Sequence, residues 1–369
     1  AVGRMAIFAL NIMPYITASI VIQLLTSVVP HLEQLKKDGE AGRKQINQYT
    51  RYGTVLLATI QGYGIAVGLE GAQGVVVDPG FYFRASAVIT LVGGTVFLMW
   101  LGEQVTARGV GNGISLIIFA GIVAELPSAL AGTLELGRQG AISTFIILAL
   151  IIMVIAVIAF IVFMERAQRR LLVQYPKRQT ASGMAQGESS HLPLKLNTAG
   201  VIPPIFASSL LLMPITLANF STDATGGALG TVAALLGRGQ PLYMATYAAG
   251  IIFFCFFYTS IVFSPNDTAD NLKRYGGFIP GIRPGQRTAE YIDRVLTRLT
   301  AVGAMYLTLV CLLPEFLINA YNVPFYFGGT SLLIVVNVTM DTVGQVQGHL
   351  FAHQYEGLIK KSKVGGKKR

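Results

Sequence analysis

The sequence predicts an all-α polytopic membrane protein, and three observations support this fold class. Of the 369 residues, 53% are hydrophobic and only 12% are charged, which is roughly half the charged share of a soluble domain. The apolar residues gather in blocks of about 20, the length that a helix needs to cross a bilayer. Long unbroken apolar runs, such as residues 145–164, favour helices over the alternating strands of a membrane barrel. Soluble enzymes, disordered scaffolds and secreted disulfide domains are therefore disfavoured.

Nine apolar blocks predict nine membrane-spanning helices. Each block is bounded by charged residues or by clusters of Gly, Pro and Asn, and the second block is the shortest. The blocks cover residues 6–29, 54–69, 85–101, 114–132, 141–164, 198–219, 241–263, 299–318 and 325–344.

The placement of Lys and Arg predicts the orientation in the membrane. Alternate loops and the C-terminal segment hold the great majority of the 28 basic residues. Basic loops face the cytoplasm in polytopic proteins, so the N-terminus of this chain is external and its C-terminus is cytoplasmic. Nothing before the first block directs the N-terminus outside, and we therefore expect a leading helix that this chain lacks.

The predicted spans hold few groups that carry chemistry. Only Glu125, Glu315 and Asp341 are charged, and all three lie toward the ends of blocks. Ionisable groups at mid-membrane mark ion pathways, so their absence argues against an ion-coupled transporter. The sequence holds neither a Walker A nor an HExxH motif, and Cys255 and Cys311 lie inside apolar blocks. We expect no enzyme activity, no cofactor and no metal site.

Prolines lie well inside two of the blocks. Pro14 lies in the first block, and Pro203, Pro204 and Pro214 lie in the sixth. A proline removes a helical hydrogen bond, and broken membrane helices usually line a cavity or a moving interface. A static kink is the alternative interpretation.

Five stretches carry longer motifs. They are IFALNIMPYITASIVIQLL (7–25), LMWLGEQVTARGVGNGISLII (98–118), HLPLKLNTAGVIPPIFASS (191–209), GFIPGIRPGQRTAEYID (277–293) and VPFYFGGTSLLIVV (323–336). Together they resemble the SecY family, the central subunits of bacterial protein-conducting channels. The resemblance covers essentially the whole chain and implies a ten-helix fold of two pseudo-symmetric inverted halves, in which the nine blocks are helices two to ten.

The resemblance also implies a domain organisation. The segments are an N-terminal half (1–132), an external hinge (133–140), a C-terminal half (141–344) with basic cytoplasmic loops at 165–197 and 264–298, and a basic cytoplasmic tail (345–369). In the family, a plug that follows helix one closes the channel from outside. Residues 1–5 would be at most the tail of that plug.

A ring of isoleucines is implied at the waist of an hourglass pore. Its members are Ile12, Ile16, Ile114, Ile118, Ile205 and Ile334. The first two pairs are spaced i, i+4, which places each pair on one helical face. An apolar constriction of stiff, β-branched side chains can exclude ions by dewetting. On spacing alone, lipid-facing or core isoleucines would be the simpler interpretation.

The family opens sideways between its second and seventh helices, which correspond to the two blocks with prolines well inside them. Thr17, Gln23 and Met213 are the candidate residues of this lateral gate. Thr17 and Gln23 could instead bond to neighbouring helices.

The two basic loops are implied to dock the SecA motor or the ribosome. Arg283 in GIRPG matches the docking arginine of the family, while Lys177 and Arg178 are placed to meet ribosomal RNA phosphates. Relatives often carry an arginine pair where this chain has Ser182 and Gly183, a departure from the family pattern.

The resemblance implies a subunit that moves unfolded secretory polypeptides across the bacterial cytoplasmic (inner) membrane and releases apolar segments sideways into lipid. The expected partners are SecE, SecG, SecA, the ribosome, secretory and membrane-protein nascent chains, accessory proteins of the SecDF and YidC types, and membrane lipid, but no DNA. A secondary transporter with inverted repeats and broken helices is the alternative, and a membrane enzyme is the third hypothesis. The lack of mid-membrane charge and of a catalytic constellation argues against these two.

Overall fold

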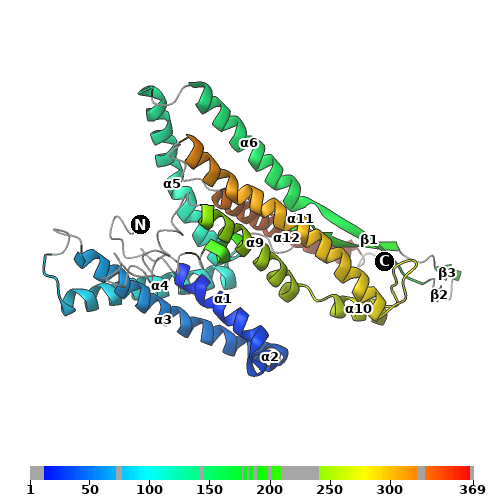
Figure 1. Ribbon diagram of the computed structural model, residues 1–369. Helices are drawn as coiled ribbons and strands as arrows, with labels where there is room; N and C mark the ends of the chain where they lie inside the picture. Colours follow the sequence, from blue (N-terminus) through cyan, green and yellow to red (C-terminus); the bar gives the residue numbers. More distant parts are fainter. Residues whose placement is uncertain are drawn as a thin grey trace. The chain divides into compact units, whose positions relative to one another are not determined.

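The chain is described from a computed structural model, which is mainly helical (Figure 1). The structure describes residues 12–71, 77–140, 144–176, 178–180, 183–185, 189–197, 202–208, 211, 241–321 and 329–365. They fall into two compact units. The first unit contains the described residues up to Ser128, Leu211 and those from Ile334 onward, and the second contains those from Ala129 to Ser208 and from Arg238 to Leu333.

The first unit begins with helices α1 (Met13–Val28), α2 (Pro30–Lys37) and α3 (Glu40–Gly71). Only the extended Val29 separates α1 from α2, and Pro30 opens α2, a position where its missing N–H costs no hydrogen bond. Gly39 adopts a φ of 81° in the turn before α3, a conformation that favours glycine. The segment between the first two predicted spans, residues 30–53, is mostly helical.

Helices α3 and α4 (Phe81–Arg108) pack against each other through small side chains. Ala58 and Leu91 form a buried core, and Gly62 lets the α4 backbone approach α3. Thr54 and Thr95 are buried and donate their hydroxyl hydrogens to the carbonyls four residues earlier, Thr54 at 2.7 Å and Thr95 at 3.1 Å. Small residues at the contact are typical of helix packing in lipid.

Helix α5 (Gly113–Arg138) follows, and it includes Pro127 and part of the predicted hinge at 133–140. The hinge residues up to Arg138 are helical, and Gly140 ends the turn with a φ of 77°. The hinge itself stays a prediction.

In the second unit, α6 (Thr144–Arg166) leads almost directly into strand β1 (Gln168–Gln174) (Figure 1). Strand β1 pairs in antiparallel register with β4 (Ser189–Lys195), and the shorter β2 (Arg178–Thr180) pairs with β3 (Gly183–Ala185). The loop at 165–197 therefore contains β structure, which the prediction of an all-α protein did not include.

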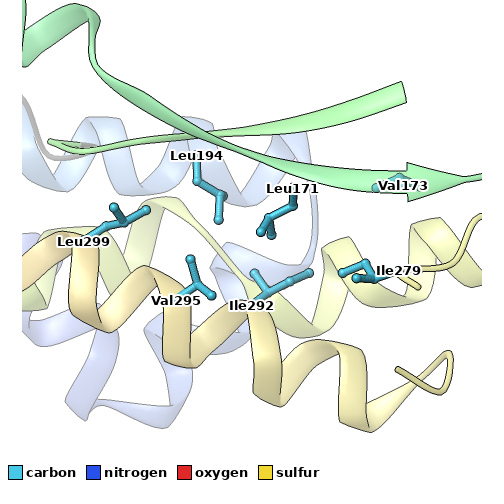
Figure 2. Close-up of a cluster of buried hydrophobic side chains, with 7 residues drawn as sticks. All are labelled: Leu171, Val173, Leu194, Ile279, Ile292, Val295 and Leu299. Carbon is cyan, nitrogen blue, oxygen red and sulfur yellow. The ribbon is translucent and has the colours of Figure 1, made fainter. Parts of the chain in front are cut away.

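The remaining helices are α9 (Pro241–Val262), α10 (Pro265–Arg274), α11 (Gln286–Tyr321) and α12 (Gly329–Gly365). Helix α11 packs on α9 and on α10. Its first turns, together with β1, β4 and the segment after α10, enclose an apolar core that enters a predicted span only at Leu299 (Figure 2). The core side chains are Leu171, Val173, Leu194, Ile279, Ile292, Val295 and Leu299.

Within the described residues, four helical stretches are long and apolar enough to cross a membrane. They are Phe81–Arg108, Thr144–Arg166, Pro241–Arg274 and Gln286–Leu313, and shorter apolar helices cover Pro14–Thr26 and Gly113–Ala124. These stretches fall on the first, third, fourth, fifth, seventh and eighth predicted blocks. The sixth block and the start of the ninth lie largely outside the described residues.

Candidate pore, gate and docking sites

The first two predicted pore isoleucines lie at the start of α1. Ile12 precedes the helix and is 0% exposed, and Ile16 is 6% exposed. The Ile16 amide donates to the Ile12 carbonyl at 3.2 Å, so the two side chains share one helical face. Pro14 is buried in the first turn of α1, where a proline is tolerated without a break. Within the described residues it does not interrupt α1.

The second pair, Ile114 and Ile118, lies half-buried on α5. The start of this helix is fixed by side chains: the Asn112 amide oxygen accepts from the Ile114 amide at 3.2 Å, and the Thr106 hydroxyl oxygen accepts from the Gly113 amide at 2.8 Å. These bonds satisfy amide groups that a helix start leaves without partners. They also set the face on which Ile114 and Ile118 lie.

Ile334 lies on α12 and is 6% exposed. Further along the same helix, the Gln345 amide oxygen accepts from the Gly111 amide at 2.7 Å. Gly111 has a φ of 85°, and this contact joins α12 to the turn before α5 within the first unit. Sequence analysis missed Asn337, one helical turn after Ile334, whose amide nitrogen is buried with no hydrogen-bond partner among the described residues.

Ile205 belongs to the second unit, in a helical segment at 202–208 that has Pro203 and Pro204 in its first turn. The Phe206 ring meets Phe254 of α9 edge to face with centroids 5.7 Å apart. The structure thus gathers five of the six isoleucines into one unit and places the sixth in the other. Closure of the ring stays a prediction.

Two of the three predicted gate residues are described. Thr17 is buried beside Ile16 on α1. Gln23, one turn and a half further on, has a buried amide oxygen without a hydrogen-bond partner among the described residues. Met213 and Pro214 lie outside the described residues.

The predicted docking arginine, Arg283, is exposed in the turn between α10 and α11. Gly281 and Gly285 give this turn its shape with φ values of 81° and 104°. The Thr288 hydroxyl, buried in α11, donates to the Arg283 carbonyl at 2.7 Å. The turn is therefore attached to the helix that follows it, and the Arg283 side chain faces solvent.

The other docking residues lie on the β2–β3 hairpin. Arg178 begins β2, opposite Ala185 of β3, and Gly183 begins β3. Lys177 and Ser182 lie outside the described residues. Below this hairpin, Gln174 and Phe278 exchange two backbone hydrogen bonds, both at 2.9 Å, which join the two basic loops into one structure.

Sequence analysis also missed a polar cluster below the β1–β4 pair, where Asn197 and Tyr306 both bond to Glu165. These residues are 32 and 141 positions from Glu165 along the chain. A glutamate at the end of the most apolar block was the one signal that the sequence offered.

Both the sequence and the fold of this chain are similar to those of known proteins. The sequence profile of the SecY family matches residues 6–343. The protein translocase subunit SecY of Escherichia coli strain K12 is 58% identical over 370 aligned positions, which span 99% of this chain and 84% of the relative.

Two solved structures share the fold. A protein-conducting channel superposes with a TM-score of 0.69 at 20% identity, covering 92% of this chain and 81% of that one. Sec61 in a canine ribosome–channel complex superposes with a TM-score of 0.65 at 19% identity, again covering 92% and 81%. The profile match and the close bacterial relative confirm the resemblance, and the chain belongs to the SecY family.

Proposed function

We propose that this chain is the pore-forming subunit of a protein translocase. It moves unfolded secretory polypeptides across the membrane, releases apolar segments sideways into lipid, and performs no enzymatic chemistry. One observation of the structure carries the proposal: the pore isoleucines Ile12, Ile16 and Ile334 are almost completely covered by protein. Such burial argues against the lipid-facing half of the alternative interpretation, and the crosslinking experiment below tests the pore against the other half, ordinary core residues.

An apolar constriction suits this task. Branched aliphatic side chains offer a passing polypeptide no fixed hydrogen bond, so no segment of the substrate is held strongly. When no polypeptide fills it, the same constriction opposes ion passage by dewetting. The energy for movement then comes from a docked partner.

The lateral gate is proposed at Thr17, Gln23 and Met213, between halves 1–132 and 141–344 that pivot at 133–140. The Gln23 amide oxygen supports a contact there, because a buried polar atom without a hydrogen bond costs about 1–3 kcal/mol. If the Gln23 amide oxygen gains a hydrogen bond when the gate opens, the open gate recovers that free energy.

The docking surface is proposed at Arg283, Lys177 and Arg178, for the ribosome and for SecA, with SecE and SecG as further subunits. The canine relative in a ribosome–channel complex supports the ribosome as a partner. The exposed Arg283 side chain, on a turn that is bonded to α11, suits phosphate contacts, whose strength falls with salt. We place the chain in the bacterial inner membrane, with its first residues external and its last residues cytoplasmic.

A crosslinking experiment tests the pore. Ile205→Cys is introduced with Cys255→Ala and Cys311→Ala, and a secretory chain with one cysteine is stalled in reconstituted vesicles that hold the complete translocase. The matched control is Ile155→Cys on α6, whose side chain is 62% exposed on an apolar helix. We expect a strong disulfide crosslink at position 205 and none at position 155.

The absence of a crosslink at position 205, with the substrate engaged and stalled, would remove Ile205 from the pore. The translocase function would then rest on family membership, without support from this residue. Equal crosslinking at both positions would mean that the substrate reaches the lipid face without selection.

A further inference from the structure

Three polar side chains from three elements meet where the β1–β4 pair joins the helices. Glu165 lies in the last turn of α6, Asn197 in the turn after β4, and Tyr306 in the middle of α11. The Asn197 amide donates to Glu165 Oε1 at 2.9 Å, and the Tyr306 hydroxyl donates to the same oxygen at 3.3 Å. One carboxylate oxygen thus holds two donors that are far apart in the sequence.

Burial makes these bonds consequential. Asn197 is 6% exposed and Tyr306 is 2% exposed, so neither side chain can readily exchange its bond for one to water. Buried polar groups are almost always hydrogen-bonded, and bonds to a carboxylate are among the stronger ones. The loss of one partner would leave a buried group unsatisfied.

The backbone is clamped at the same place. The Leu196 amide donates to the Ala167 carbonyl at 3.1 Å, directly beyond the last paired residues of β1 and β4. On α11, a Cβ placed on Gly303 would lie 2.6 Å from the Leu196 carbonyl oxygen. Helix α11 therefore touches the turn with its backbone, and any side chain larger than that of glycine at position 303 would require the backbone to shift.

The aromatic ring of Tyr306 completes the contact. It meets Phe160 of α6 edge to face, with centroids 5.7 Å apart. The hydroxyl and the ring of one residue therefore tie α11 to both the end and the body of α6. These contacts attach the base of the β1–β4 pair to both α6 and α11.

The position of Asn197 gives this joint a role. The helical segment 202–208, which contains Ile205, begins five residues after Asn197 in the sequence. On the other side of Asn197, β4 pairs with β1, and Gln174 at the end of β1 exchanges backbone hydrogen bonds with Phe278, five residues before Arg283. Asn197 thus stands between the proposed docking surface and a proposed pore residue.

We propose that Glu165, Asn197 and Tyr306 form a positioning latch that couples the docking loops to the segment carrying Ile205. With the latch closed, movement of a docked partner is transmitted through the β1–β4 pair to that segment. With the latch open, the partner still docks but its movement is lost at the joint. The inference rests on the proposed function of the docking loops and of Ile205.

The test uses the complete translocase in inner-membrane vesicles and compares two readouts, SecA binding and the rate of preprotein translocation. Asn197→Asp places a second carboxylate against Glu165, and Tyr306→Phe removes one donor while keeping the ring. Tyr82→Phe, at an exposed position on α4, is the matched control for loss of a hydroxyl.

The reciprocal double variant, Glu165→Gln with Asn197→Asp, provides the rescue. The introduced glutamine amide has two hydrogens, one for the introduced carboxylate and one for the Tyr306 oxygen. Both contacts and the single negative charge are then restored with donor and acceptor exchanged.

We expect translocation to slow about tenfold or more with Asn197→Asp and roughly threefold with Tyr306→Phe, as for loss of buried hydrogen bonds. We expect SecA binding to stay within about twofold of wild type, and the double variant to regain most of the rate because the paired changes compensate. Tyr82→Phe should change neither readout.

Two results would overturn the latch. One is a double variant as slow as Asn197→Asp, and the other is a parallel loss of SecA binding and translocation in the single variants. Failure of the pore proposal would give a different result. The Ile205→Cys variant, with Glu165, Asn197 and Tyr306 unchanged, would then give no crosslink to the substrate. If Asn197→Asp reduces the amount of protein in the membrane, Tyr306→Phe and the double variant still decide the question.

Discussion

Helix α6 and the core beneath the docking loops are neighbours in sequence, yet they place their apolar side chains in opposite directions. Along α6, most aliphatic and aromatic side chains face outward, and Leu150 and Ile161 are its buried residues. In the adjoining loops, the apolar residues of β1, β4 and α11 face inward around Ile292 (Figure 2). The switch occurs within a few residues of Arg166.

The difference shows which solvent each region meets. A helix surrounded by lipid gains nothing by hiding leucine or isoleucine, so its packing relies on close contact of small residues and on polar bonds. A loop in water gains about 25 cal/mol for each Å² of apolar surface that it buries. The loops thus fold as a small water-soluble protein would, and α6 does not.

The largest expected effect is the difference in stability between a substitution in the loop core and the same substitution on the exposed face of α6. Ile292→Ala should destabilise the loop core by about 2–5 kcal/mol, because it leaves a cavity at a fully buried position. Ile155→Ala removes the same atoms from the exposed face of α6 and should cost far less, since lipid fills the space. Thermal unfolding of the purified protein in detergent, combined with protease cleavage in the loops, measures both. Equal losses would mean that α6 is also held by burial of its apolar side chains.

A smaller effect tests whether backbone contact is as important as side-chain burial at the boundary. Gly303→Ala drives a methyl group against the Leu196 carbonyl oxygen, which is backbone and has little freedom to move, and should cost about 1–3 kcal/mol. The control is Gly348→Ala in α12, where a Cβ meets no atom within 4 Å.

The control should be neutral or should stabilise by up to about 1 kcal/mol through helix propensity. The shift in melting temperature of each variant provides the comparison. An unchanged Gly303→Ala protein would show that α11 and the turn move apart without penalty.

The smallest effect concerns an ion pair in the first unit. Arg51 of α3 donates two hydrogen bonds to Glu103 of α4, at 2.9 Å and 2.8 Å. Arg51→Lys keeps the charge but loses the bidentate geometry, and we expect a loss of about 0.5 kcal/mol because the pair is partly exposed.

That difference should shrink in high salt, since screening weakens both versions of the pair. Melting curves at two salt concentrations give the measurement. A loss of several kcal/mol, insensitive to salt, would mean that lipid or protein shields this pair far more than its exposure indicates.

The membrane helices could be predicted from the sequence because a single property, an apolar run of sufficient length, determines them. The strands in the loop at 165–197 could not, since the alternation in β1 is short and follows Gln168 and two arginines. Helix α2 was missed for a similar reason, because its eight residues are mostly polar and lie between two longer helices.

The site residues also divide into those that a local sequence pattern predicts and those that only the tertiary fold brings together. The i, i+4 spacing of Ile12 with Ile16 predicted a shared face, which the helical hydrogen bond between them confirms. No spacing predicted that Glu165 would bond to Asn197 and Tyr306, because only the packing of α6 against α11 brings such distant residues together. Local patterns report helices and faces, whereas contacts between elements depend on the tertiary fold.

Helix α12 is longer than a membrane is thick. Its 37 residues give a rod about 55 Å long at about 1.5 Å per residue, while the hydrocarbon layer is roughly 30 Å thick. The exposed Leu358 lies on the order of 36 Å along this rod from Ile334. Any molecule that grips the far end therefore has a long lever arm, and a tilt of a few degrees there displaces the end by ångströms while Ile334 moves little.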